Sequence, residues 1–349
     1  MRMTTFFSLR LIGWCSLLVA GLGTGCDEKP GAQSLRFRVP EHFPALVYDT
    51  INNRVTPDGF ALGKMLFYDG LLSRDGTISC GSCHQQGYAF THHGHALSHG
   101  IDDQLGSRNA PPIQNMAWTS SFFWDGGVFD LDLFSISPIE NPVEMDEDMV
   151  RVLEKLKAHP KYPGLFKAAY GTDEINSARV LQALSQFMIM LISDQSRYDQ
   201  YVTGDEKVLT AAEQAGLAVF EAKCATCHSG VLQTDQTFRN NGLPLRPAPD
   251  EGRYRITLNP ADKYRFKVPS LRNVAVSAPY MHDGRFRTLD AVLDHYRDGV
   301  ARTENLDPVL AQGAKPGIAL TEEEKTLLIS FLHTLTDTAF LFDDRFSEY

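Results

Sequence analysis

Apolar side chains recur at helical spacing in three stretches of the first half of the chain. Residues 60–67 and 150–157 each place their apolar positions on one helical face. Residues 175–193 are rich in Leu, Ile, Met and Phe, which predicts a helix inside the core. Residues 87–106 instead carry Gly and His with too little periodicity for a long element. We therefore predict three helices here, with 87–106 as a loop.

Two helix-start signals mark the second half. Thr210 stands three residues before Glu213, which is the capping-box spacing, and Thr321 and Glu324 repeat it. The first box predicts a helix that leads into Cys224, and the second predicts a helix near the C-terminus. No region of the chain is rich in strand pattern. The chain is therefore predicted to be mainly α, with long loops.

The chain also carries an internal repeat. When Asn115 is aligned with Asn273, further identical or similar residues coincide without a gap. The matched pairs are Ala117 with Ala275, Thr119 with Ser277, Asp125 with Asp283, Gly126 with Gly284, Leu131 with Leu289 and Asp132 with Asp290. We infer two duplicated domains, 56–203 and 204–349, that have diverged in function.

Residues 1–26 are typical of an export signal. Arg2 and Arg10 accompany an apolar run, 11–22, that is short for a membrane span. The run leads into Cys26 and resembles a bacterial lipobox, except that Gly23 stands where an apolar residue is usual. We expect a periplasmic protein, either anchored by a lipid on Cys26 or simply exported. Residues 27–55 are predicted to be a linker.

Bulk composition narrows the choice of partners. A hydrophobic content of 43% over 349 residues is enough to build packed cores. With 33 basic and 43 acidic residues, the formal charge is −10. Such a charge argues against nucleic acid or an anionic membrane surface as a partner. A basic or dipolar soluble redox partner would suit the chain better.

Cysteine and histidine supply the strongest chemical signal. Cys80-Gly81-Ser82-Cys83-His84 and Cys224-Ala225-Thr226-Cys227-His228 both have the spacing for covalent c-type haem attachment. The two thiols would add to the haem vinyl groups, and the adjacent His would bind the iron. Of the six cysteines, the other two are Cys15, in the signal, and Cys26. Structural pairing within each motif is the alternative interpretation.

Longer motifs resemble the bacterial di-haem cytochrome c peroxidase and MauG family over nearly all of the chain after residue 55. Beside the two haem motifs they are residues 62–69 (LGKMLFYD), 108–111 (RNAP), 123–126 (FWDG), 138–145 (PIENPVEM), 268–273 (VPSLRN) and 278–284 (APYMHDG). The resemblance implies two c-type cytochrome-like haem domains with two covalently bound haem c groups.

The resemblance implies a role for each matching residue. His84 would be the proximal ligand of the first haem, where peroxide binds, and His228 that of the second haem, which passes electrons. Trp124 would relay electrons between them, although a core Trp is the alternative. Glu144 would be the distal acid and base, with Pro138 lining the peroxide pocket. Burial would raise the pKa of such a carboxyl; a surface or helix-capping acid is the alternative.

Two positions separate the subfamilies. Tyr296 matches the sixth ligand of the second haem in MauG-like members, where other members have Met. A phenolate oxygen lowers the potential of the iron. Met281, in an apolar turn, is the alternative ligand. His99 matches a loop His that caps the resting first haem in the peroxidases, and a solvated His-rich loop is the alternative.

A calcium ion between the domains is also implied by the resemblance. Its ligands would be the side chain of Asn109 and backbone carbonyls near Ser277 and Pro279. The family often has Thr at the position of Ser277, a change that a backbone ligand tolerates.

The implied activity is reduction of hydrogen peroxide to water. A small periplasmic donor, a cytochrome c or a cupredoxin, would supply electrons to the C-terminal haem, which would pass them to the N-terminal haem. One alternative is a MauG-like enzyme that oxidises residues of a partner protein through a high-valent di-haem state. The other is a pure electron-transfer cytochrome. Dimeric relatives also suggest a homodimer.

Overall fold

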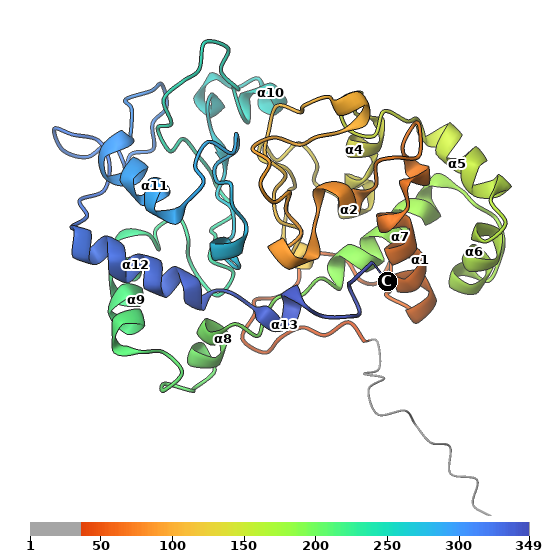
Figure 1. Cartoon of the computed structure of the whole chain (residues 1–349), viewed down its shortest axis with the longest axis horizontal. Helices are drawn as coiled ribbons and strands as arrows, with labels where there is room; N and C mark the ends of the chain where they lie inside the picture. Colours follow the sequence, from red (N-terminus) through yellow and green to blue (C-terminus); the bar gives the residue numbers. More distant parts are fainter. Residues whose placement is uncertain (1–35, 349) are drawn as a thin grey trace, which may run out of the picture. The chain divides into compact units, whose positions relative to one another are not determined.

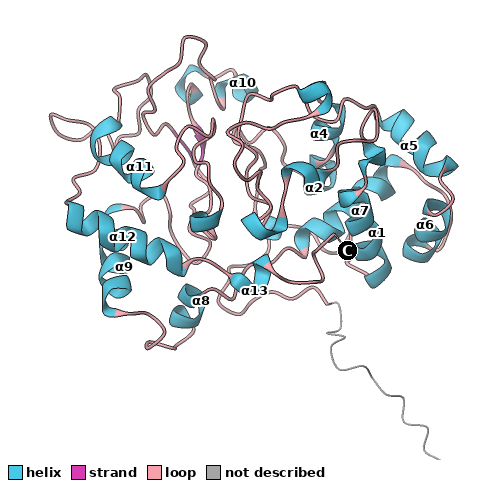
Figure 2. Ribbon diagram, in the orientation of Figure 1, coloured by secondary structure: helices cyan, strands magenta, loops and turns pink. Residues whose placement is uncertain are grey.

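Helices and loops make up almost all of the structure, a computed structural model that describes residues 36–348 (Figure 2). The only strands in this range are β1 (Phe238–Arg239) and β2 (Phe266–Lys267), which pair antiparallel. The predicted mainly α class is therefore confirmed. No helix between residues 36 and 348 is long and apolar enough to cross a membrane.

Thirteen α-helices are assigned within the described range. They are α1 (Pro57–Tyr68), α2 (Cys80–Cys83), α3 (Leu131–Phe134), α4 (Ile136–Glu140), α5 (Met149–Ala158), α6 (Tyr162–Tyr170), α7 (Ser177–Ile189), α8 (Arg197–Val202), α9 (Ala211–Lys223), α10 (Tyr254–Thr257), α11 (Leu289–Asp294), α12 (Glu322–Thr334) and α13 (Thr338–Leu341). The predicted export signal, Cys26 and the start of the predicted linker lie outside the described residues.

Two long helices, α1 and α7, pack against each other in the first half (Figure 1). The side chain of Thr56 caps α1 by accepting from the Gly59 N–H, and Pro57 fills the first helical position. A Cβ on Gly63 would lie 1.9 Å from the carbonyl oxygen of Ala183, so only glycine permits this helix contact. The helices predicted at 60–67 and 175–193 are thus confirmed as α1 and α7, and α5 confirms the one predicted at 150–157.

The helices α9 and α12 form the corresponding pair in the second half (Figure 1). Both predicted capping boxes form at their first turns. The two helices approach closely at Gly216, where a Cβ would lie 2.1 Å from the carbonyl oxygen of Leu327. A buried apolar cluster surrounds this contact and consists of Leu217, Phe220, Val274, Leu289, Leu293, Leu328, Phe331, Leu332 and Leu335.

The repeated segments have the same local backbone. Asn115 and Asn273 are both left-handed, with φ of 53° and 58°. The Asn115 N–H donates to Leu191 at 2.9 Å, and the Asn273 N–H donates to Leu335 at 3.0 Å. Positive φ also recurs at Phe123 and Met281, and at Gly126 and Gly284. The spacing found in the sequence therefore corresponds to a repeated conformation.

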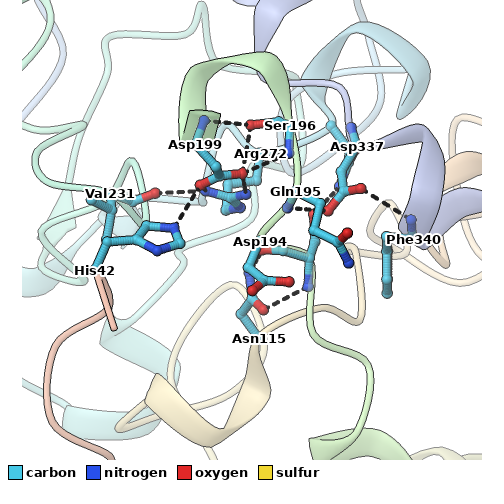
Figure 3. A network of polar contacts seen from close by, with 12 residues as sticks. His42, Asn115, Asp194, Gln195, Ser196, Asp199, Val231, Arg272, Asp337 and Phe340 are labelled. Atoms are coloured by element: carbon cyan, nitrogen blue, oxygen red, sulfur yellow. Dashed lines mark hydrogen bonds and ion pairs between the residues drawn. The ribbon is translucent and has the colours of Figure 1, made fainter. Parts of the chain in front are cut away.

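A buried ion pair joins the two halves of the chain (Figure 3). Nη1 of Arg272 lies 2.9 Å from Oδ1 of Asp199, and their side chains are only 0% and 3% exposed. Arg272 also donates to the carbonyl of Val231, while Ser196 and His42 donate to the Asp199 carboxylate. Burial raises the pKa of Asp199, but the hydrogen bonds and charge of Arg272 outweigh burial and hold it below its usual value.

Replacing Arg272 should destabilise the protein strongly. We expect Arg272→Met to lower the free energy of unfolding by about 3–5 kcal/mol, because Asp199 would stay buried without its partner. Urea unfolding of the haem-loaded protein, followed by circular dichroism, measures the change. The matched control, Arg151→Met, removes an exposed ion pair with Asp148 and a 3.9 Å contact with Glu147, which keeps Lys155 as its partner, and should cost under about 1 kcal/mol. Equally small losses in both variants would contradict this prediction.

Candidate functional site

The first haem motif begins with a single helical turn, α2. Ser79 caps this turn and exchanges hydrogen bonds with Ser82. Residues three apart lie on the same face of a helix, so the turn brings Cys80 and Cys83 to one side. His84 follows directly as the C-terminal cap. Local sequence alone therefore presents both thiols and the imidazole within one short segment.

The two motif histidines have the same tautomer. Nδ1 of His84 lies 2.6 Å from the carbonyl oxygen of Phe90, and Nδ1 of His228 lies 3.2 Å from that of Gln233. A carbonyl oxygen can only accept, so each Nδ1 carries the proton and each Nε2 keeps its lone pair. Burial lowers the pKa of His84 to about 4 and lowers that of His228 as well. Both rings are neutral and can bind iron through Nε2.

The four motif cysteines are free thiols with raised pKa values. Burial raises the pKa of Cys80 and of Cys224 to about 12, and it also raises the pKa of Cys83 and Cys227. Redox-active Cys pairs instead contain a thiol with a lowered pKa. Neither motif in the described part of the chain is closed by a disulfide. These thiols fit covalent haem attachment better than structural pairing.

A cavity of about 830 Å³ lies against the first motif. His84, Trp124, Pro138 and Glu144 all line it. Pockets for small ligands usually measure about 300–1,000 Å³, so this space lies near the upper end of that range and can take a large planar group. The fold thus brings together four predicted site residues that are far apart in the sequence.

Glu144 lines the first cavity with a half-buried carboxyl. Burial raises its pKa, against hydrogen bonds from Ser98 and Asn141 that lower it, and the Ser98 Oγ lies 3.4 Å from Oε1. The Ile101 N–H donates to the Glu144 carbonyl at 2.8 Å. A Cβ on Gly100 would lie 2.4 Å from that same carbonyl oxygen. The 98–101 loop therefore fixes the position of Glu144.

His99 does not line the first cavity. Its Nε2 lies 3.4 Å from a carboxylate oxygen of Asp103, and its side chain is 33% exposed. His92 and His95 stack on each other nearby, with ring centroids 4.1 Å apart. The His99 carbonyl oxygen accepts from the Cys83 thiol at 3.5 Å, so the His99 backbone lies beside the first motif. Its imidazole does not line the cavity, and its capping role stays a prediction.

A second cavity, of about 210 Å³, lies against the second motif. Tyr296, Met281 and His228 all line it, so both candidate sixth ligands reach the same space. Burial raises the pKa of Tyr296 to about 12, and a hydrogen bond with Asn241 opposes this shift. Nδ2 of Asn241 also donates to the Met281 sulfur at 3.3 Å. Placement alone does not choose between the two ligands.

Trp124 lines both cavities. Its indole Nε1 donates to the carbonyl oxygen of Asn109 at 2.9 Å, and its own carbonyl accepts from the Lys267 N–H at 2.7 Å. The Asn109 N–H in turn donates to the carbonyl of His282 at 2.7 Å. These bonds tie the first half of the chain to the second where the cavities meet. Core packing and electron relay are compatible at this position.

The three predicted calcium ligands lie together beside the second cavity. Asn109, Ser277 and Pro279 all line it. Nδ2 of Asn109 donates to the carbonyls of His95 and Ala96, so its Oδ1 is the atom that could bind a cation. Residues 36–348 contain no group of three or more His, Cys, Asp or Glu that could hold a metal ion. The calcium site would rely on amide and carbonyl oxygens and stays a prediction.

Sequence reasoning missed two polar residues of the second cavity. Lys267 lines it, donates through Nζ to the Ser121 carbonyl at 2.5 Å, and has its pKa lowered to about 8 by burial. Its place directly before the 268–273 motif could have drawn attention to it. Asn241 gave no such signal, because an Asn-Asn-Gly run indicates an ordinary turn.

Comparisons with known proteins are consistent with this arrangement. Residues 57–207 match the family model for di-haem cytochrome c peroxidase. The methylamine utilization protein MauG of Methylorubrum extorquens is 36% identical over 330 residues, which is 92% of this chain and 89% of that protein. The cytochrome c551 peroxidase of Nitrosomonas europaea is 36% identical over 249 residues, 69% and 74% of the two chains. A crystal structure of a MauG-like protein associated with microbial copper homeostasis has a TM-score of 0.79 and 34% identity, and the match covers 90% and 99% of the two chains.

Haem content should follow the two cysteine pairs. We expect the exported wild-type protein to keep two haems after denaturation, because thioether bonds survive unfolding. The double variant Cys80→Ala with Cys83→Ala should keep one, and so should Cys224→Ala with Cys227→Ala. Mass spectrometry of the denatured chains measures this directly. A wild-type mass equal to that of the polypeptide alone would rule out covalent attachment.

Proposed function

The chain belongs to the di-haem cytochrome c peroxidase family, and we propose that it reduces hydrogen peroxide to water with electrons from a small periplasmic donor. One observation carries this proposal. The Glu144 carboxyl and the metal-binding side of His84 belong to one cavity. Peroxide cleavage needs a proton shuttle next to an iron, and this cavity offers a position for each.

Haem c fits the residues at both motifs. We propose that thioether bonds hold one haem at each motif through the free thiols Cys80, Cys83, Cys224 and Cys227. His84 and His228 would bind the iron through Nε2, since their Nδ1 atoms face carbonyl oxygens. Haem bound in this way supplies an iron that can bind peroxide or pass electrons. The shared backbone around Asn115 and Asn273 supports a duplicated pair of haem domains, 56–203 and 204–349.

Glu144 moves the proton in this proposal. Its carboxylate accepts a proton from one peroxide oxygen and returns it to the other, which departs as water. Reduction of one hydrogen peroxide to two waters takes up two electrons and two protons in all. Burial raises the pKa of Glu144, so the group both binds and releases a proton nearer neutral pH. The hydrogen bond from Ser98 orients the carboxyl, and Pro138 lines the same space.

Trp124 relays electrons from the second site to the first. Its indole is oxidisable, lines both cavities and is held by a hydrogen bond to Asn109. The proposed direction of electron transfer, from the second site to the first, follows from the contrast between the two cavities. The second offers Tyr296 or Met281 as a closing ligand, whereas the first offers Glu144 as a proton shuttle.

His99 is the proposed cap of the resting first haem. Its imidazole lies against Asp103 and outside the first cavity. To reach the iron it would have to leave that carboxylate and turn inward with its loop. Such a movement would make the first site switchable between a closed and an open form.

A MauG-like oxidation of residues on a partner protein is the second candidate function. Tyr296 favours it, because an anionic phenolate oxygen lowers the potential of the iron and stabilises its oxidised form. The 36% identity to a methylamine utilization protein MauG is a further argument. A pure electron-transfer cytochrome would instead have both irons closed. A high-spin EPR signal from the first iron would exclude that third possibility.

The proposed setting is the periplasm, with Cys26 as a lipid anchor. A calcium ion on Asn109 and on the carbonyls near Ser277 and Pro279 would brace the contact between the halves. A cytochrome c or a cupredoxin would donate electrons, and the formal charge of −10 favours a basic one. We further propose a homodimer.

Turnover should depend on the Glu144 carboxyl. We expect Glu144→Gln to reduce peroxide consumption by about 10²–10⁴-fold, because the amide cannot accept the proton. Steady-state assays with reduced cytochrome c measure this. In the wild type, turnover should fall as the pH drops through the raised pKa of Glu144, because protonation removes the proton acceptor. The exposed Glu140 provides a matched control, and Glu140→Gln should keep wild-type turnover. Equal turnover in wild type and Glu144→Gln would reject the proposed function.

Tyr296→Met should remove the response of the second site to peroxide. A neutral thioether stabilises the oxidised iron less than a phenolate does, so the peroxide-induced optical and EPR changes at that site should disappear. Tyr280→Phe is the matched control, because Tyr280 lines the same cavity while its hydroxyl donates to the Val274 carbonyl. An unchanged response in Tyr296→Met removes the main argument for the MauG-like function.

A further inference from the structure

Asn241 contacts both candidates for the sixth-ligand position. Its Nδ2 donates to the Met281 sulfur at 3.3 Å, and its side chain also forms a hydrogen bond with Tyr296. All three side chains line the cavity that contains His228. A single side chain thus acts on two competing ligands.

The backbone of Asn241 holds the segment that carries Tyr296. Its carbonyl oxygen lies 3.1 Å from Nε2 of His295, and since a carbonyl can only accept, His295 is the donor. His295 directly precedes Tyr296 in a single π-helical turn, His295–Gly299. Such turns often occur at functional sites. Asn241 is therefore linked to the Tyr296 segment through both its backbone and its side chain.

Neighbouring contacts hold Asn241 in place. The side chain of Asn240 donates to the Glu304 carbonyl at 2.7 Å. The Gly242 N–H donates to the Asn240 side chain at 2.9 Å, and the Gly242 carbonyl accepts from the Ala301 N–H at 2.8 Å. Gly242 also needs its positive φ of 68° for this turn. The amide of Asn241 therefore approaches its neighbours as a fixed donor.

The amide donor of Asn241 acts directly on the thioether ligand. A thioether sulfur is a weak acceptor, and an N–H directed at it competes with an iron for the same electron pairs. Donation from Asn241 to the Met281 sulfur therefore disfavours Met281 as a ligand and leaves the position to Tyr296.

We propose that Asn241 is a positioning residue that selects Tyr296 over Met281 as the protein ligand of the second iron. The inference rests on the proposed function, because it requires haem at the second motif. The choice matters for the chemistry, since a phenolate lowers the potential of a haem iron and a thioether raises it. Asn241 thereby sets whether the second site readily gives electrons to the first or stabilises its own oxidised form.

The ligand at the second iron of haem-loaded, full-length Asn241→Leu tests this proposal. Leu has a similar shape but donates no hydrogen bond. EPR and resonance Raman spectra of the resting protein should show a Met-ligated population that the wild type lacks. We expect the ligand ratio to move by about tenfold, which is what losing one hydrogen bond of ~1.4 kcal/mol gives. The midpoint potential of the second haem should rise with it.

A double variant separates competition from general damage. Asn241→Leu combined with Met281→Leu has no competing thioether and should return to a single Tyr-ligated form. Asn241→Asp keeps the shape of the side chain without the amide donor, and it serves as the second test if the Leu variant does not fold. It should show the same Met-ligated population.

Three results would overturn the proposal. They are an unchanged Tyr-ligated spectrum in the folded Asn241 variants, a double variant that stays as perturbed as the single one, and a wild type that is already Met-ligated. Absence of peroxide reduction by the wild type would reject the peroxidase proposal instead. That outcome leaves the ligand measurement standing, so the two failures can be told apart.

Discussion

The buried contact between Arg272 and Asp199 is the constraint on which the arrangement of the two halves depends. Two charges that leave water lose solvation, and only a nearly complete set of partners makes their burial tolerable. Here the Asp199 carboxylate also accepts from Ser196, at the start of α8, and from His42, in the segment before residue 56 (Figure 3). Segments from three parts of the chain are held at one point because each satisfies part of the same buried charge.

Residues next to this ion pair connect it to the segments that line both cavities. Arg272 directly precedes Asn273, whose amide oxygen accepts from the Asp337 N–H and whose Nδ2 donates to the Ser193 hydroxyl. Asn273 opens the second repeated segment as Asn115 opens the first. The two segments share a backbone, so they carry Trp124 and His282 at corresponding places. Both of these residues hydrogen-bond to Asn109, where the two cavities meet.

Since the two segments share a conformation, the difference between the sites lies in their side chains. The first cavity has Glu144, a carboxyl that burial makes easier to protonate. The second has Tyr296 and Met281, which can close an iron, under the influence of Asn241. In the proposed function, proton transfer therefore belongs to the first site and control of the iron potential to the second. Such a division suits an enzyme that takes in electrons at one iron and uses them at another.

The sequence by itself determined five of the helices, α1, α5, α7, α9 and α12, with two capping boxes and the two haem motifs, because these depend on residues a few positions apart. Family motifs added Glu144, Trp124 and Tyr296, and the fold gathers them around two cavities. Only the tertiary structure could place the His99 imidazole outside the first cavity, or show Asn241 in contact with Met281. Short-range patterns specify backbone torsions and caps, whereas the direction in which a loop side chain points is decided by packing against distant segments.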